Sequence, residues 1–398
     1  MSLNHILKMY FAISVTFMTF AFAGNEVEKE WTFLIFLNAN NNLDSFGDMN
    51  LKQMESLGSN EKMNIVVQWG SMSRKTVKRM LVKKSTNPNK ITSPVVRDLG
   101  NADMGDFKEL EKFLKWGHQK YPAKKYFVSV WNHGNGWYRS ELAEKGIHIN
   151  DISYDDKTGN KITTEQLGLV MGNFSKYIHR KIDLYGSDAC LMSMAEVASE
   201  MKDSVSYFAG SQQVEPGEGW PYKEFLRAWN KAPESGPAQV GNLLADEYLK
   251  AYSGGVYGHA NITFSILNLN ALSSFENSVK SFVSELRGFS QSEKREAMLA
   301  ANEALYFTNS DYKDFFHFIK LLDAKNLMLE STKAKLNTTF NDLVVVSKNS
   351  ESYKEAKGLS IWLPDSAWQL DRYKERYSKL KFNQNTGWLE FLDFLNQN

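Results

Sequence analysis

The 398-residue sequence is poor in several features that mark specialised proteins. It has one cysteine and eight prolines, and 47 Lys and Arg residues stand against 46 Asp and Glu residues, a formal net charge of +1. One cysteine excludes an internal disulfide framework and a Cys-rich zinc module, because each needs at least two thiols. A nearly neutral chain also lacks the basic surface that nucleic-acid binding requires. Stability must therefore come from an apolar core.

Three catalytic motifs are missing as well. The chain contains no His-Glu-x-x-His pair, no Gly-x-Ser-x-Gly elbow and no Gly-x-Gly-x-x-Gly fingerprint. These absences disfavour a zinc peptidase, a serine hydrolase and a dinucleotide-binding enzyme. The sequence predicts no metal ligand set.

The first residues have the pattern of an export signal. Residues 9–20 form an apolar run, and the small-x-small sequence Ala21-Phe22-Ala23 follows it. The run is shorter than the roughly 20 residues that a membrane span needs, which disfavours the alternative of a stable membrane anchor. We interpret residues 1–23 as a signal peptide and expect a secreted or periplasmic protein.

From residue 31 onward, short apolar runs alternate with amphipathic stretches, a pattern typical of an α/β protein with a mostly parallel sheet flanked by helices. We interpret residues 24–255 as the core and residues 256–398 as a largely helical extension of the same unit. The expected strands are 31–37, 63–69, 78–83, 95–99, 126–131, 181–190, 207–211, 262–267 and 358–363. The expected helices are 44–57, 106–119, 192–201, 240–252, 271–286, 292–307, 312–322 and 332–345.

Two predicted strands end in residues that suit thiol chemistry. His133, followed by Gly134, ends one strand, and Cys190 ends another. Ligands of open parallel sheets bind at this edge, where an imidazole can take the proton of a thiol. The helix expected from residue 192 would lower the thiol pKa, and the N–H groups of Gly134 and Cys190 are candidates for an oxyanion hole. The alternative for Cys190 is a small buried hydrophobe.

The sequences around these two residues point to a family. The segments Trp131-Asn132-His133-Gly134-Asn135-Gly136-Trp137 and Gly186-Ser187-Asp188-Ala189-Cys190 resemble the paired motifs of the clostripain family of cysteine peptidases, relatives of caspases, legumain and gingipains. The resemblance extends over residues 31–222. It implies a caspase-like fold, with His133 as general base and Cys190 as nucleophile, and it places Asp188 in the pocket for the substrate residue before the cut.

An aspartate in that pocket makes physical sense for a basic substrate residue, because a partly buried carboxylate favours a matching cation. We therefore expect cleavage of peptides and proteins after Arg or Lys. Gln212 and Gln213 stand where such sequences often carry acids, which leaves Glu215 or Glu218 for a second charge. The alternative for Asp188 is a turn residue or a helix N-cap.

The resemblance also implies maturation by a cut between the two motifs, and the polar stretch 138–146 offers Arg139 and Lys145 as processing sites. The product would be a monomer or two processed chains held together. No cofactor is required by the sequence. Calcium is left open, because Asp156, Gly159 and Glu165 resemble an EF-hand loop whose first position, Tyr154, has no carboxylate. The alternative function is a catalytically silent, caspase-like peptide-binding module.

Overall fold

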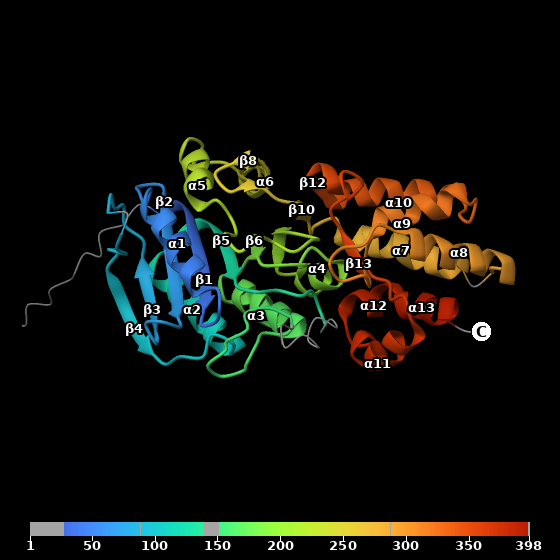
Figure 1. Ribbon diagram of the computed structural model, residues 1–398, viewed down its shortest axis with the longest axis horizontal. Coiled ribbons are helices and arrows are strands. Elements are labelled where there is room, and N and C mark those ends of the chain that lie inside the picture. The colour runs from blue at the N-terminus through green and yellow to red at the C-terminus, as the bar shows by residue number, and fades with distance from the viewer. Residues whose placement is uncertain (1–27, 88, 139–150, 287, 397–398) are drawn as a thin grey trace, which may run out of the picture.

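The computed structural model describes residues 28–87, 89–138, 151–286 and 288–396. A nine-stranded sheet runs through the molecule in the order β12-β10-β7-β6-β5-β1-β2-β3-β4 (Figure 1). Its strands are β1 (Lys29–Ala39), β2 (Met63–Ser71), β3 (Thr76–Leu81), β4 (Val95–Gly100), β5 (Ala123–Trp131), β6 (Ile182–Asp188), β7 (Val205–Gly210), β10 (Thr263–Asn268) and β12 (Val344–Asn349). Two small ladders pair β8 (Ser253–Gly255) with β9 (Gly258–His259) and β11 (Tyr312–Asp314) with β13 (Ser360–Trp362).

The five central strands, β7, β6, β5, β1 and β2, are parallel, and antiparallel strands extend both edges. Strand β2 is added on one side of β1, and β5, β6 and β7 are later added in that order on the other side. The loops after β1 and β5 therefore leave the sheet in opposite directions, which opens a crevice between them at the carboxyl ends of the strands. This mostly parallel arrangement confirms the predicted α/β class.

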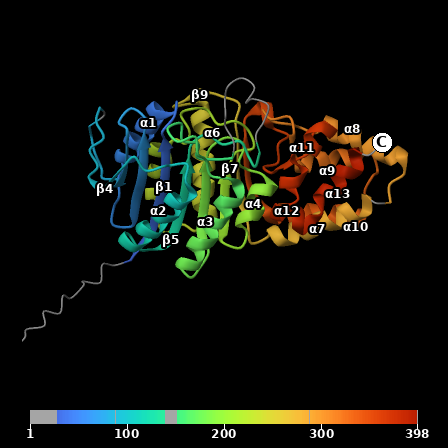
Figure 2. The ribbon, with the colours of Figure 1, turned by 90° about the horizontal axis from the view of Figure 1, so that it is seen from below.

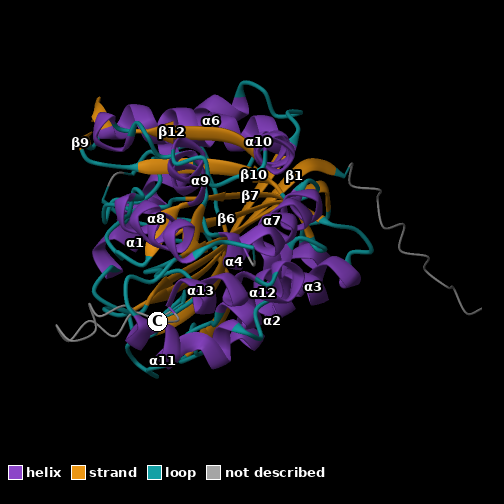
Figure 3. Ribbon diagram, turned by 90° about the vertical axis from the view of Figure 1, so that its right-hand side faces the viewer, coloured by secondary structure: helices purple, strands orange, loops and turns teal. Residues whose placement is uncertain are grey.

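Helices cover both faces of the central strands (Figures 2 and 3). Buried side chains of β1 alternate between two cores, with Phe33 and Ile35 on one face and Leu34 and Phe36 on the other. Burying each of them stabilises the fold by roughly 1.5–3 kcal/mol. One face carries α1 (Asp44–Glu55), α5 (Tyr222–Asn230) and α6 (Pro237–Tyr252), and the other carries α2 (Phe107–Lys120), α3 (Thr164–Tyr177) and α4 (Ala195–Met201).

The remaining helices form a C-terminal lobe beside the β10–β12 edge (Figure 1). Its apolar side chains belong to the same core cluster as those of α2, α3 and α4. With β10 and β12, residues beyond 255 also complete the central sheet. The lobe consists of α7 (Leu272–Leu286), α8 (Gln291–Glu303), α9 (Phe315–Ala324), α10 (Glu330–Leu343), the 3-10 turn η2 (Glu351–Tyr353), α11 (Ala367–Tyr377), α12 (Lys381–Thr386) and α13 (Trp388–Asn396). Within the described residues, we find no helix with the length and apolar character of a bilayer span.

Some expected elements differ from the structure. The predicted helix 332–345 ends at Leu343, and the run from Val344 continues as the edge strand β12. Valine favours this change because its β-branched side chain fits a pleated sheet better than a helix. The predicted helix 312–322 likewise begins as strand β11, and α9 starts only at Phe315, where Asp314 caps it by accepting a hydrogen bond from the His317 amide.

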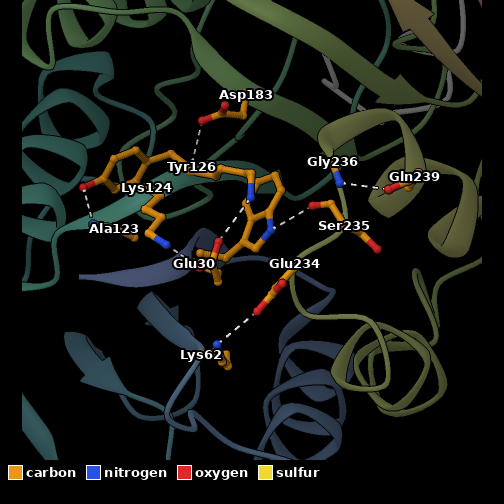
Figure 4. A network of polar contacts seen from close by, with 12 residues as sticks. Glu30, Lys62, Ala123, Lys124, Tyr126, Asp183, Glu234, Ser235, Gly236 and Gln239 are labelled. Carbon is orange, nitrogen blue, oxygen red and sulfur yellow. Dashed lines mark hydrogen bonds and ion pairs between the residues drawn. The ribbon is translucent and has the colours of Figure 1, made fainter. Parts of the chain in front are cut away.

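The amino ends of the strands are tied together by surface contacts (Figure 4). Lys124 contacts Glu30 at 2.6 Å, and Lys62 contacts Glu234 at 3.1 Å. The Trp31 indole donates to the carbonyl of Ser235, which fastens the loop between α5 and α6 to the start of β1. This end of the sheet is closed by paired charges, whereas the carboxyl end holds the candidate site.

Candidate active site

A pocket of about 180 Å³ lies at the carboxyl ends of β5 and β6. His133 follows β5, while Asp188 and Cys190 come from the end of β6, and all three line this pocket. The structure thus brings together the predicted base, nucleophile and specificity residue. The predicted processing residues Arg139 and Lys145 lie outside the described residues. The complete lining is Leu43, Trp131, Asn132, His133, Asp188, Ala189, Cys190, Val214, Glu215, Pro216, Gly217 and Gly219.

The imidazole of His133 is oriented by Asn42, which lies in the loop after β1 and was not predicted as a site residue. The Oδ1 of Asn42 lies 2.6 Å from Nε2 of His133. Because a carbonyl oxygen only accepts, Nε2 carries the hydrogen and Nδ1 keeps a free lone pair. Burial lowers the pKa of His133 to about 4. The imidazole is therefore neutral near pH 7 and able to accept a proton.

Asn42 is held by side-chain turns in the loop after β1. The amide N–H of Asn40 donates to Asn38 Oδ1 at 3.1 Å, and that of Leu43 donates to Asn41 Oδ1 at 2.9 Å. Asparagine commonly shapes loops in this way. Four asparagines within residues 38–42 thus shape this support, and its role becomes visible only when the fold brings it beside His133.

The thiol of Cys190 is half-buried and surrounded by backbone N–H groups. The amide of Glu215 donates to its sulfur at 3.3 Å, and the amides of Gly134 and Cys190 itself also point to it. Burial raises the pKa of Cys190, and these donors oppose that rise. The substrate-free pair is therefore a neutral thiol beside a neutral imidazole.

The expectation that a helix starts directly after Cys190 and lowers its pKa is wrong. Helix α4 begins at Ala195, and the chain first makes a sharp turn in which Leu191 has a φ of +62°. A left-handed conformation costs a non-glycine residue about 1–2 kcal/mol. The amide of Leu191 donates to the carbonyl of Gln213, which holds this turn in place. The strained turn, and not a helix end, presents the thiol at the sheet edge.

Gly134 is required by the close approach of the two motifs. A Cβ atom at this position would lie 2.6 Å from the carbonyl oxygen of Cys190 and 2.9 Å from the Cβ of Ala189. Glycine permits this contact because it has no side chain. The β5 loop can thus bring its N–H groups against the turn that carries the thiol.

Asp188 and Glu215 form a pair of buried carboxyl groups in the pocket wall. Asp188 Oδ2 accepts from the Tyr222 hydroxyl at 2.8 Å and from the Trp220 amide at 3.4 Å. The carboxyl of Glu215 faces Asp188 and the indole N–H of Trp220, but among the described residues no donor reaches hydrogen-bond geometry with either of its oxygens. Burial raises the pKa of both groups, to about 7 for Asp188. The charge of Asp188 raises the pKa of Glu215 further, whereas a hydrogen bond from the Glu215 carboxyl opposes the rise at Asp188.

The wall behind this carboxyl pair is aromatic. Tyr252 donates to the carbonyl of Gly219 at 2.8 Å, and the buried hydroxyl of Tyr248 has no hydrogen-bond partner in the described part of the chain. Gly219 has a φ of +64°, and a Cβ there would come within 2.8 Å of Asp188 Oδ1. Because apolar rings exclude water, the pair sits in surroundings that strengthen its interaction with any cation entering the pocket.

The clostripain family model matches residues 35–394, which span both motifs, the pocket and the C-terminal lobe. The chain belongs to the clostripain family. It is 26% identical to clostripain of Hathewaya histolytica over 316 residues, which are 68% of this chain and 59% of that protein. The resemblance to this family of cysteine peptidases is therefore confirmed.

Solved structures of C11 proteases share the fold. An inactive zymogen from Parabacteroides distasonis is 19% identical and has a TM-score of 0.67, with 90% of this chain and 98% of that chain covered. A secreted C11 cysteine protease from Bacteroides thetaiotaomicron, in complex with an irreversible peptide inhibitor, is 16% identical with the same TM-score, covering 90% of this chain and 99% of that one. These likenesses confirm the fold expected from the resemblance.

This clostripain-family chain holds its Glu215 loop with the two glutamines that depart from the family pattern. Gln213 Oε1 accepts from the hydroxyl of Thr308 at 2.6 Å, and its amide nitrogen donates to the hydroxyl of Tyr353. Gln212 donates to Asp314 at 2.9 Å. These neutral side chains do not line the pocket; instead, they anchor its loop to the C-terminal lobe.

Two observations speak against calcium at the EF-hand-like segment: Glu165 is paired with Arg376 at 2.7 Å, and the oxygens next to Asp156 are already used. Asp155 Oδ2 accepts from Asn40 at 2.8 Å and from the amide of Met104 at 3.0 Å, so its oxygen is already used. The ammonium of Lys157 contacts Asn40 Oδ1 at 2.8 Å and the carbonyl of Ser71 at 3.2 Å. A lysine cation thus fills the surrounding oxygen positions. Within the described residues, no group of three or more His, Cys, Asp or Glu side chains is arranged to hold a metal ion.

Proposed function

We propose that this clostripain-family protein is a cysteine endopeptidase that hydrolyses peptide bonds after Arg or Lys. The observation that carries the proposal is that His133, Cys190 and the Asp188–Glu215 carboxyl pair line the same pocket. A nucleophile, a base and a site for a cation stand within one small cavity. That combination suits acyl transfer from a peptide with a basic residue before the cut.

In the first step, Nδ1 of His133 takes the thiol proton as the sulfur of Cys190 attacks the carbonyl carbon. Asn42 holds Nε2–H, so the imidazolium that forms keeps its orientation. His133 then gives the proton to the leaving amine, which departs as the thioester forms. Water hydrolyses the thioester in the second step, with His133 again as base, and the free thiol is restored.

The negative oxygen of each tetrahedral intermediate is stabilised by the N–H groups of Gly134 and Cys190. Both already point to the region of the sulfur in the substrate-free protein. Donors that are fixed before the reaction need no reorganisation as charge develops, and removing one such donor in other enzymes costs about 10²–10³ in kcat. The close packing at Gly134 keeps the two donors together.

The basic specificity comes from the buried carboxyls. A guanidinium has five donors and forms bidentate contacts with carboxylates, while an ammonium acts as a compact cation. Glu215 supplies the second acid that Gln212 and Gln213 do not. Asp188 accepts hydrogen bonds from Tyr222 and the Trp220 amide; since it does not cap α4, the N-cap alternative does not describe it.

The protein is exported by its residues 1–23 and is matured by self-cleavage at Arg139 or Lys145. Tyr138 is buried before this segment and bonded to Asp311, and Asp151 after it is buried against Arg376 at 2.6 Å. The two chains remain together because β5 and β6, on either side of the cut, pair in one sheet. We expect no metal requirement, and Lys157 already occupies oxygens beside the segment in which calcium was left open.

Short fluorogenic peptides ending in Arg, Lys, Asn or Asp test the proposal, under reducing conditions with and without a calcium chelator. Cleavage after Arg and Lys is expected, with loss in Cys190→Ala and no effect of the chelator. Cleavage only after Asn or Asp would refute the role of Asp188. Absence of any cleavage, also after limited proteolysis and with calcium added, would favour a silent binding module.

A further inference from the structure

The Asp188–Glu215 pair is incompletely hydrogen-bonded in a way that an added proton would correct. Asp188 receives its donors on one oxygen, Oδ2, and Glu215 receives none from the described residues. Two adjacent carboxylates in a dry site repel each other, as in carboxyl dyads that share a proton. A proton on either carboxyl removes one charge and creates an O–H donor that faces the other.

We propose that Asp188 and Glu215 share a proton while the pocket is empty, and that a basic substrate side chain expels this proton when it binds. The inference rests on the proposed specificity for Arg or Lys and adds a regulation of that same site by pH. The O–H bond of one carboxyl breaks, the proton passes to solvent, and the new carboxylate pairs with the cation. No electron is transferred.

The cation makes the exchange favourable because it replaces the proton as the partner of the second carboxylate. A guanidinium spans two carboxylates with several N–H donors, whereas the shared proton provides a single O–H. Among the described residues, no Lys or Arg side chain lines the pocket. The positive charge that pairs with these two carboxyl groups must therefore come from the substrate.

Other titratable groups around the pair do not account for a transition between pH 5 and 7. Burial raises the pKa of every tyrosine around it, to about 12 for Tyr257, so these hydroxyls stay neutral. His133 has a pKa of about 4, and the raised pKa of the Cys190 thiol lies above this range. The surrounding groups are His133 after β5, Cys190 after β6, Glu218 in the 211–219 loop, Tyr222 and Glu224 on α5, Tyr248 and Tyr252 on α6, and Tyr257 after it.

The test measures binding to the Cys190→Ala protein, which cannot turn over. The probe is an acetylated peptide amide ending in arginine, with the same peptide ending in citrulline as the neutral control. Titration calorimetry at pH 5–8, in buffers of different ionisation enthalpy, gives both Kd and the protons released. We expect the arginine Kd to fall about tenfold per pH unit from 5 to about 7 and then level off, with close to one proton released below pH 7.

The citrulline peptide should release no proton and should not bind more tightly as the pH rises. An arginine Kd that stays constant from pH 5 to 8, without proton release, would overturn the shared proton while leaving the basic specificity intact. Failure of the arginine peptide to bind at any pH would instead overturn the proposed specificity itself. The two failures are therefore distinguishable in one experiment.

The substitution Glu215→Gln tests whether the carboxyl pair is the source of the pH dependence and of the released proton. An amide beside Asp188 removes the like charge and supplies an N–H donor, so the carboxyl no longer retains a proton near neutral pH. Proton release at pH 6–7 should disappear and the arginine Kd should become flat in that range. Glu218→Gln, in the same loop, is the matched control and should keep the original profile. A flat profile in Glu218→Gln, or an unchanged one in correctly folded Glu215→Gln, would contradict the assignment.

Discussion

Charged side chains are exposed and paired at the amino end of the central strands, but buried and incompletely paired at the carboxyl end. At the amino end, Lys62 and Glu234 form an ion pair in which both side chains are more than half exposed. At the carboxyl end, Glu215 is buried with no hydrogen-bond donor from the described residues, and Tyr248 has a buried hydroxyl without a partner. Buried polar groups without partners are costly, so those that line the pocket beside Cys190 mark a place where a ligand can complete the interactions.

The difference shows that the contacts at one end of the sheet and the candidate site at the other end can be changed independently. The amino end can lose contacts at little cost, because water replaces them. The carboxyl end holds its groups through a strained turn at Leu191 and a close backbone contact at Gly134. Substitutions at the carboxyl end should therefore change kcat or KM, whereas substitutions at the amino end should change only the free energy of unfolding.

Asp188→Asn should have the largest effect on substrate choice. Loss of a buried carboxylate facing a cation costs roughly 2–5 kcal/mol, so we expect kcat/KM for arginine peptides to fall about 10³-fold. Steady-state kinetics with matched arginine and citrulline peptides provides the measurement. The citrulline peptide should be affected far less. Equal losses for both peptides would indicate general damage to the site.

Asn42→Ala should lower kcat about 10²-fold with little change in KM, because the imidazole loses the partner that fixes its tautomer. The conservative variant Asn42→Asp adds a carboxylate that favours the imidazolium and so raises the His133 pKa above its value of about 4. Its kcat, measured at saturating peptide, should fall at a higher pH than in the natural protein. If kcat fell at the same low pH in Asn42→Asp as in the natural protein, the positioning role of Asn42 would be contradicted.

Gln213→Ala should weaken the link between the pocket loop and the C-terminal lobe. Loss of the bonds to Thr308 and Tyr353 frees the loop that carries Glu215, so KM for arginine peptides should rise about tenfold with a smaller change in kcat. Ser199→Ala, which removes a buried bond to Glu276 between α4 and α7, is a control. A similar rise in KM in the control would assign the effect to lost stability alone.

Lys62→Ala should have the smallest effect. The exposed pair with Glu234 contributes less than about 1 kcal/mol to the free energy of unfolding, and salt weakens it further. Urea unfolding should show a slight loss of stability, and kcat/KM should be unchanged. A tenfold loss of activity would mean that the amino end communicates with the site, against the separation described here.

The sequence predicted the sheet and the reactive pair because both rest on local patterns. Short apolar runs identified β1, β5 and β6, and the strand ends located His133 and Cys190. It did not predict that the chain turns through a left-handed Leu191 before α4 begins. That conformation is imposed by packing and by the bond to Gln213 O, which a local pattern does not contain.

For a different reason, Asn42 escaped prediction and Glu215 was only one of two candidates for the second charge. Asparagine is common in turns, and the contact of Asn42 with His133 joins residues that are 91 positions apart. Glu215 and Glu218 were equivalent in sequence, and only the path of the loop buries Glu215 beside Asp188. Motifs thus identify the residues proposed to react, whereas the groups that surround and orient them depend on long-range packing.

The anchoring of the pocket loop has a consequence for when the protein becomes selective. Its supports, Thr308, Asp314 and Tyr353, are synthesised about a hundred residues or more after the glutamines that they hold. A ribosome that has just completed the Cys190 motif has therefore made His133 and Cys190 but not the residues that hold the Glu215 loop. The order of synthesis thus delays the complete wall of the pocket until most of the polypeptide exists.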